Sequence, residues 1–311
     1  MTEMDTRPTE FGAHPALPGD AEAITTKERT RLNMIIRRFF RHRLAVMSLF
    51  ALLLIAGFAF LGPLFWTWGH QVSREIPSLA SPSWDHPFGT TRAGHDVMGQ
   101  VMRGTQQTLK VGLFVAFMSI GIGASWGAIA GFYRGKVDTV MMRIVDVIII
   151  IPLLVLVLVL AGMSQGTTWL TVALIIGAFG WTTTARVVRG LTLSLREQEF
   201  IEASRAMGAT DRRIIFKHLL PTAFGVIIVD ATLIIAGAIL VEAALSFLGF
   251  GITIPDTSLG LQIQNAQEFV FTHPWVFYFP GLFVIAIVLF INFIGDGLRD
   301  ALDPKQQMVR R

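Results

Sequence analysis

The sequence contains no cysteine, and only 15% of its 311 residues are charged. The missing cysteines exclude disulfides, thiolate metal sites and cysteine nucleophiles. Soluble domains carry about 25% charged residues, so the low charge and the mean hydropathy of +0.57 argue against an ordinary soluble domain. The net charge of +4 gives no reason to expect a nucleic-acid partner, because the positions of the charges explain it.

A nucleotide-binding P-loop is also missing. The nearest approach to one is Gly135-Lys136-Val137, which has Val where a magnesium-binding Ser or Thr is needed and Ala130 where the first Gly should stand. We therefore expect that this chain binds no ATP or magnesium and has no cofactor of its own. No Ser-His-Asp or paired-carboxylate pattern indicates catalysis, so we expect a chain that is not an enzyme.

Long apolar segments are what the sequence has in abundance. Six of them are about 17 to 25 residues long, the length that crosses about 30 Å of hydrocarbon as a helix. They do not alternate apolar and polar residues, as the strands of a membrane barrel do. We therefore expect an all-α integral membrane protein with six transmembrane helices at 44–66, 111–133, 144–163, 169–185, within 223–250, and at 275–295.

Lys and Arg residues are distributed unevenly between these segments. Eight precede the first segment, three lie between the second and third, seven lie at 186–217, and four follow the sixth. Cytoplasmic connections carry the excess of Lys and Arg, so both termini and the 186–221 connection are expected in the cytoplasm. The first segment starts too far into the chain and is too long for a cleavable signal peptide.

The same patterns divide the chain into parts. Residues 1–30 are polar, contain several Pro and Gly, and are expected to form a disordered cytoplasmic tail. A basic segment and the first helix take up 31–66, and an external segment at 67–110 is expected along the outer membrane surface. The core membrane domain spans 111–304, including a cytoplasmic loop at 189–221, and 305–311 form a second cytoplasmic tail.

The loop at 189–221 is too polar for the membrane but rich in helix-forming residues. Its acidic residues come first and its basic residues later, which suits a helix dipole. Gly208 would end or bend a helix, and Pro221 would stop the second piece and begin the next membrane helix. We expect two short amphipathic helices hinged at Gly208, and a helix lying on lipid is the alternative.

This loop resembles the EAA loop of binding-protein-dependent ABC importer permeases. The family pattern is Glu-Ala-Ala, three residues, Gly, nine residues, Ile, any residue, Leu-Pro; here Ser204 replaces the second Ala and His218 replaces Ile. In that family the loop forms a coupling helix that docks into a groove on the ATPase subunit. The resemblance implies an ATPase-coupling role for Glu202, Ala203, Ser204, Gly208, His218, Leu220 and Pro221.

Further segments resemble the second, or C-type, permease subunit of dipeptide and oligopeptide importers. They are His86-Pro87-Phe88-Gly89-Thr90 with Gly94 and Asp96, the stretch 242–249, and the stretch 295–304. The family usually has Arg between that Gly and Asp, where this chain has His95. The resemblance implies a type I ABC importer permease fold and ATP-driven, alternating-access import of peptides across a bacterial plasma (inner) membrane. Nickel chelates or glutathione are the alternative cargoes.

The resemblance also implies partners. These are a second homologous permease subunit, two ATPase subunits or one double ATPase that hold ATP and magnesium, an extracytoplasmic substrate-binding protein, and the lipid bilayer. The external segment with His86, Phe88, Gly89 and Asp96 would contact the binding protein.

Two functions of other classes remain open. An ion-gradient-driven secondary transporter would show internal repeats and discontinuous helices; no clear repeat is visible between the two halves, and such a transporter leaves the EAA-like loop unexplained. A membrane-anchored assembly or signalling protein would carry no solute, and disrupting its loop would leave uptake unchanged.

Three acids lie in or near the apolar segments, where an acid is by default a functional candidate. Arg143 lies one turn before Asp146, so we expect these two to pair in a structural role. Asp230, about 13 Å along the helix from Pro221, either lines the pathway or binds a partner helix. Glu242, about 31 Å along, satisfies a helix end or meets the solute, with structure favoured. Nothing in the pattern of His86, His95 and Asp96 fixes the geometry of a metal site.

Three glycines, Gly123, Gly127 and Gly131, recur at spacings of four in the second apolar segment. This places small residues on one helix face, where another helix can pack closely. We expect packing within the subunit, and a subunit interface is the alternative.

Overall fold

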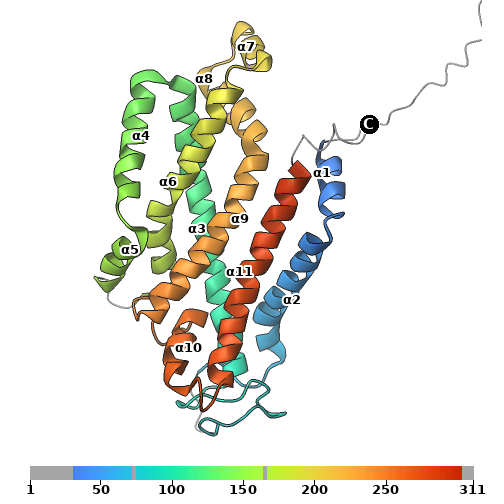
Figure 1. Ribbon diagram of the computed structural model, residues 1–311, viewed down its shortest axis with the longest axis vertical. Helices are drawn as coiled ribbons and strands as arrows, with labels where there is room; N and C mark the ends of the chain where they lie inside the picture. Colours follow the sequence, from blue (N-terminus) through green and yellow to red (C-terminus); the bar gives the residue numbers. More distant parts are fainter. Residues whose placement is uncertain (1–30, 72–74, 164–166, 303–311) are drawn as a thin grey trace, which may run out of the picture.

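Long apolar helices run side by side and form one bundle (Figure 1). The computed structural model describes residues 31–71, 75–163 and 167–302, so the tails expected at 1–30 and 305–311 lie outside the described residues. Within the described ranges, five helices are long and apolar enough to cross a membrane, and a bent pair counted as one span makes six. The expected all-α fold is confirmed, and the expected number of six spans is reached when the bent pair is counted as one span.

The continuous spans lie where the apolar segments predict them, but three are longer than expected. They are α2 (Arg43–Phe65), α3 (Val97–Tyr133), α6 (Trp169–Leu195), α9 (Leu220–Phe247) and α11 (Trp275–Leu302). The extra turns of α3, α6 and α11 carry polar residues such as Gln100 and Arg103, which an apolar-run criterion leaves out. Helix α3 therefore begins within the segment 67–110, directly after Asp96, which caps it.

The third expected span is broken into two helices. They are α4 (Gly135–Ile150) and α5 (Leu153–Gly162), which meet at an angle of 75°. The break falls at Ile151-Pro152, where proline lacks an N–H and disfavours helical backbone in the residue before it. Ile151 accordingly has an extended conformation, with ψ of 122°. The prediction of one continuous helix at 144–163 was wrong.

Helix α3 lies at the centre of the bundle and packs most closely against α6. A side-chain carbon at Gly123, Gly127 or Gly131 would collide with the backbone of α6, for instance with the carbonyl oxygen of Ala185. These glycines therefore allow two helix backbones of the same chain to touch. The expectation that they serve packing within the subunit is confirmed.

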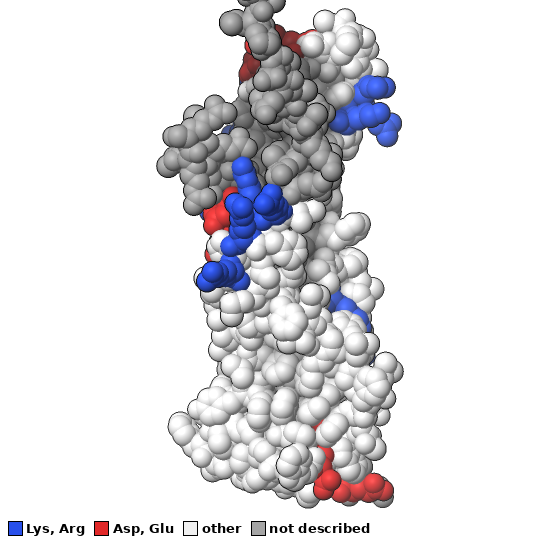
Figure 2. Space-filling model, turned by 90° about the vertical axis from the view of Figure 1, so that its right-hand side faces the viewer, with Lys and Arg blue, Asp and Glu red and all other residues white. Residues whose placement is uncertain are grey.

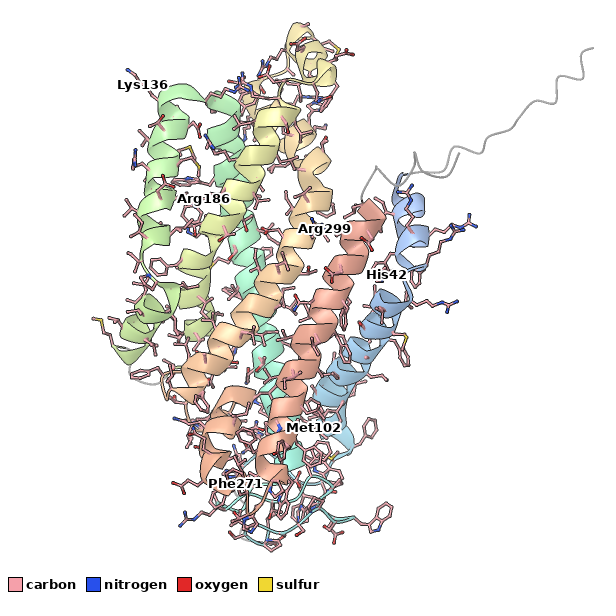
Figure 3. The ribbon with its side chains drawn as sticks, viewed as in Figure 1. His42, Met102, Lys136, Arg186, Phe271 and Arg299 are labelled. Carbon is pink, nitrogen blue, oxygen red and sulfur yellow. The ribbon has the colours of Figure 1, made fainter. Side chains whose placement is uncertain are left out.

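The bundle has two distinct ends (Figure 1). One, which we call the α7 end, carries α1 (Arg31–Phe39), the α3–α4 turn, α7 (Glu199–Ala206) and the last turn of α11. The other, the α10 end, carries the 75–96 segment, α10 (Leu259–Ala266) and η2 (Gln267–Phe269). Lys136 and Phe271 mark these opposite ends in Figure 3. Neither α1 nor α10 is predicted as a helix by the apolar pattern.

Charged side chains gather toward the two ends of the bundle (Figure 2). On the face that is shown, most Lys and Arg lie toward the α7 end together with some Asp and Glu, the broad zone below them is mostly white, and further Asp and Glu lie at the tip of the α10 end. A belt with few charges between charged ends is the surface that a hydrocarbon layer requires.

Candidate functional site

The loop expected to couple to an ATPase forms a short helix, α7, that stands out at one end of the bundle (Figure 1). Glu199 and Glu202 lie in its first turn and Arg205 in its last, an order that suits the helix dipole. The helix ends at Ala206, and Gly208 follows with φ of +81°.

Gly208 closes α7 with a Schellman motif. The Gly208 N–H donates to the Arg205 carbonyl at 2.9 Å, and the Ala209 N–H donates to the Ser204 carbonyl at 3.0 Å. This motif needs a residue in the left-handed region, which glycine adopts without a steric penalty. The predicted helix end at Gly208 is therefore explained by backbone geometry in this chain.

The second half of the loop differs from the prediction. Helix α8 (Asp211–Arg213), the π-helix η1 (Ile214–Leu219) and α9 form one continuous helical rod, capped at its start by Thr210. The prediction that Pro221 stops a separate helix was wrong, because Pro221 lies at the second position of α9, within the rod. Proline lacks the N–H that a continuous α-helix would need there, and the wider π-helical turn directly before it accommodates this. A movement of the loop would therefore act directly on a membrane span.

One face of α7 is packed onto the bundle and the other is open. Ile201 is fully buried in an apolar cluster with residues of α3, α6 and η1. Ser204 is also buried, and its hydroxyl donates to the Phe200 carbonyl at 2.7 Å. Glu202 and Ala203 are exposed on the other face. The side chain of Met207, directly after α7, is also exposed, with 80% of its surface accessible.

Of the remaining expected coupling residues, His218, Leu220 and Pro221 lie on the rod beside α7 rather than on its open face. His218 and Leu220 are half-buried, and Pro221 is exposed. The structure thus brings Glu202, Ala203 and Gly208 together as an exposed group.

Cationic and aromatic side chains connect α7 and the ends of α3 and α6. The Arg205 guanidinium lies 5.2 Å from the centre of the Phe132 ring, and the Arg196 guanidinium approaches the same ring and bonds to the Phe132 carbonyl. Arg134 pairs with Glu197 at 2.7 Å. Arg205 thus joins α7 to α3, and the other two contacts join the end of α6 and the residue after it to α3 and the turn that follows α3.

Two ion pairs connect α4 to α6. Arg189 binds Asp138 through two bonds of 2.5 and 2.6 Å, and Arg186 binds Asp146 at 2.6 Å. Figure 3 labels Arg186 between these helices. The prediction that Arg143 pairs with Asp146 was wrong, because the partner comes from the neighbouring helix. A structural role for Asp146 is compatible with this geometry.

A cleft of about 450 Å³ opens where the broken pair α4–α5 faces α6 and α9. Its walls are mainly apolar, with Ile149, Leu153 and Phe179 among them. Asp230 is the one charged side chain lining it within the described chain, and the Thr184 hydroxyl donates to its Oδ2 at 2.7 Å. Sequence reasoning left open whether Asp230 lines a pathway; here it lines a cleft.

Glu242 lies in a buried network of hydroxyl groups. Its side chain is fully buried and accepts bonds from Thr108 at 3.2 Å and from Ser246 at 2.7 Å. Ser246 in turn contacts Ser258, whose hydroxyl caps α10. The network joins α3, α9 and α10, so the geometry favours the structural interpretation of Glu242.

The residues expected to contact a binding protein are largely buried at the α10 end. His86 Nδ1 lies 2.9 Å from Asp96 Oδ1, and Asp96 Oδ2 accepts bonds from the Trp66 indole at 2.8 Å and the Gly99 N–H at 2.7 Å. Both side chains are buried, so they fix the start of α3 instead of forming a surface.

Phe88 and Gly89 are packed in the same way. Phe88 stacks on Phe279 with ring centres 4.1 Å apart. Gly89 has φ of +73° and adjoins Trp275, where a side chain would collide. Contact between this segment and a binding protein stays a prediction.

A cluster of three polar side chains, Arg103, Gln107 and Asp256, was not predicted from the sequence. Arg103 on α3 binds Asp256 through bonds of 2.9 and 3.0 Å, and the Gln107 amide donates to Asp256 Oδ2 at 2.5 Å. Partial burial raises the pKa of Asp256, but the bonds from Arg103, the Thr257 N–H and Gln107 outweigh it and leave that pKa below its ordinary value. A separation of 153 residues gives no local signal for this pair.

Two histidines lie at the same end. Burial lowers the pKa of His70, and the nearby Arg103 charge lowers it further, against a smaller opposing effect of Asp256. Burial, with the nearby His70, also lowers the pKa of His95.

Comparison with known proteins agrees with this geometry. Residues 123–308 match the family described as binding-protein-dependent transport system inner membrane component, and residues 30–82 match the N-terminal TM domain of oligopeptide transport permease C. The oligopeptide transport system permease protein OppC of Mycobacterium tuberculosis is 40% identical, over 92% of this chain and 99% of the relative. The dipeptide transport system permease protein DppC of Bacillus subtilis is 39% identical, over 86% of this chain and 84% of the relative.

A solved chain of the MetNI methionine ABC transporter, in an inward-facing conformation, has a similar fold. It is 26% identical with a TM-score of 0.53, and the match covers 66% of this chain and 98% of that one. The expected type I ABC importer permease fold is thereby confirmed. The chain belongs to the family of binding-protein-dependent transport system inner membrane components.

Proposed function

We propose that this chain is the C-type permease subunit of an ATP-driven peptide importer. Its identity of about 40% to an oligopeptide permease and of 39% to a dipeptide permease, over most of the chain, supports peptides as the cargo. The single structural observation that carries the proposal is the open face of α7, with Glu202, Ala203 and Gly208 exposed beyond the membrane spans.

The α7 end faces the cytoplasm in this proposal. Lys136 lies at that end and the basic loop at 186–217 reaches it, as the excess of cations on cytoplasmic connections requires. Both α1 and the last turn of α11 lie there too, which supports a cytoplasmic location for the two termini. The α10 end then faces the extracytoplasmic binding protein.

Coupling to ATP hydrolysis follows from the way α7 is held. The ATPase partner moves α7, and α7 is joined to α3 through Arg205 and Phe132 and precedes a helical rod that continues into α9. The movement therefore reaches the walls of the cleft between α4, α5, α6 and α9. A second permease subunit of similar fold completes the pathway, and ATP and magnesium are held by the ATPase subunits.

The discontinuous helix α4–α5 is a feature that a secondary transporter also predicts. Here one proline, Pro152, accounts for the break, and membership of the binding-protein-dependent family favours the ATP-driven mechanism. The break therefore gives no separate support to an ion-gradient mechanism.

ATP hydrolysis by the assembled complex tests the proposal. The complex would contain this chain, its partner permease, the ATPase subunits and the binding protein, and would receive a mixed peptide pool, a nickel chelate or glutathione. We expect stimulation by peptides alone. Stimulation by nickel chelate or glutathione, with none by peptides, would move the cargo to the alternatives. Failure of any ATPase to co-purify under conditions that preserve the complex would contradict the ABC assignment.

A further inference from the structure

The carboxylate of Asp230 has no cationic partner among the residues that the structure describes. Both arginines of the neighbouring stretch of α6 are already paired, Arg186 with Asp146 and Arg189 with Asp138. None of the ion pairs formed by the described residues includes Asp230, which receives only the hydroxyl of Thr184 on Oδ2. Its second oxygen, Oδ1, faces no donor from the described residues.

This carboxylate lies deep in the bundle. Asp230 comes ten residues after the start of α9, at Leu220, and 17 residues before its end, at Phe247. Thr184 is similarly placed within α6. A charge at this depth is costly unless a counter-ion or water reaches it, and such residues typically mark ligand pathways.

The break between α4 and α5 also lines the cleft. Helix α4 ends at Ile150, and Ile148, Ile149 and Ile151 line the cleft together with Asp230. The last carbonyl groups of a helix have no intrahelical donors and carry about half a negative charge. Backbone without helical hydrogen bonds is tolerated at membrane depth where it lines a cavity. Pro152 and Leu153, at the start of α5, line the same cleft and bring the opposite, positive end of a helix dipole. The two helix ends offset each other, so Asp230 is the negative charge that the described lining of this mainly apolar cleft offers.

We propose that Asp230 binds the cationic amino terminus of a peptide as it passes through this cleft, an inference that rests on the proposed peptide transport. An ammonium group offers three donors and no acceptor, which suits the free Oδ1 of Asp230. Thr184 holds the carboxylate in place from α6. The apolar walls accept side chains of many kinds, so recognition falls on the positive charge that all unmodified peptides share, because the carboxylate of Asp230 repels their negative carboxyl terminus.

The test compares two peptides of the same sequence, one with a free amino terminus and one with it acetylated. Calorimetry first establishes that the binding protein holds both peptides. Transport is then measured in liposomes containing the complete complex, with the wild-type chain or with Asp230→Asn. A charge-assisted hydrogen bond corresponds to roughly a tenfold effect or more, so the wild type should carry the free peptide about tenfold faster than the acetylated one. Asp230→Asn should remove most of that difference by slowing the free peptide alone.

Two further variants separate recognition from structure. Asp230→Glu keeps the charge and should keep the preference for the free amino terminus, even if Asp230→Asn does not assemble. Asp146→Asn removes a carboxylate of the spans that does not line the cleft, so it should change the transport of both peptides by the same factor.

The contrary results are distinct. If the wild-type complex carries both peptides equally fast, or Asp230→Asn slows both equally, Asp230 serves the fold or pairs with a basic residue of the partner permease, and the inference is overturned while peptide transport stands. If the wild type carries neither peptide, the proposed function fails and this inference fails with it.

Discussion

Arg189 on α6 and Asp138 on α4 are joined by two hydrogen bonds, from Nε to Oδ1 at 2.5 Å and from Nη2 to Oδ2 at 2.6 Å. The flat guanidinium matches the carboxylate in both positions, which gives such a pair direction as well as charge. The pair joins the first turns of α4, whose last residues line the cleft, to the stretch of α6 that leads into the coupling loop.

The first prediction concerns this pair. Arg189→Lys keeps the charge but loses the two-bond geometry, and Asp138→Asn loses the charge. Because both side chains are partly exposed, at 33% and 14%, we expect each variant to lower the free energy of unfolding by about 1 to 2 kcal/mol. Thermal unfolding of the purified complex measures this. If the double variant loses as much free energy of unfolding as the two single variants lose together, the two side chains do not interact.

The second prediction concerns Gly208. Gly208→Ala should strain the backbone by about 1 kcal/mol, because φ is +81° there, and the strain should weaken ATPase attachment and uptake. Gly208→Pro should do so more strongly. Gly208→Asn is the matched control, since asparagine adopts left-handed backbone more readily and the space beside Gly208 is open in this chain. Normal uptake by Gly208→Pro would refute the coupling-loop assignment. Loss of coupling by the Asn variant would instead indicate close approach of the ATPase.

The third prediction concerns Glu242. Glu242→Ala leaves the buried hydroxyls of Thr108 and Ser246 without their acceptor and should lower the free energy of unfolding by about 2 to 4 kcal/mol. Glu242→Gln keeps one acceptor oxygen and should cost less. Glu268→Gln is a control at an exposed site of the α10 end and should change stability by less than about 0.5 kcal/mol. A Glu242→Gln complex with unchanged unfolding temperature and abolished transport would favour contact with the solute instead.

The fourth prediction is a loss of stability in acid at the α10 end. Burial lowers the pKa of His70 and of His95 below their ordinary value of 6.5, so the folded chain binds fewer protons there than the unfolded chain. Stability from these groups is therefore present above pH 6.5 and falls as the pH decreases through that value and below it. Asp256, with its lowered pKa, acts in the same direction at still lower pH.

Unfolding temperatures at pH 7.5 and 5.5 measure this effect. The wild-type complex should unfold at a lower temperature at pH 5.5, and replacing both histidines by glutamine should reduce the difference. An unfolding temperature equally sensitive to pH in that double variant would place the responsible groups elsewhere.

Much of the fold could be predicted because a membrane span must be long and apolar. The predictions failed where polarity or a single residue overrides that rule. Polar residues such as Gln100 continue α3 beyond the apolar segment, and Pro152 breaks a run whose hydropathy alone indicates one helix. The rod that carries Pro221 into α9 depends on a π-helical turn, which has no sequence pattern of its own.

The candidate site was predictable where it is local in sequence. The helix end at Gly208 and the exposed Glu202 follow from spacing and backbone chemistry within one loop. The partners of the two acids could not be predicted in this way. Arg186 binds Asp146 across a separation of 40 residues, and Thr184 binds Asp230 across a separation of 46 residues. Such contacts depend on which helices pack together, and apolar periodicity does not determine that.

Peptide accumulation in liposomes containing the complete complex tests the central claim most directly. The external binding protein would deliver a labelled peptide, with or without ATP available to the ATPase subunits, and with ion gradients present or collapsed by ionophores. The account predicts accumulation against a gradient that requires ATP and survives the collapse of ion gradients. Accumulation without ATP that stops when the ion gradients are collapsed would contradict it and establish a gradient-driven transporter.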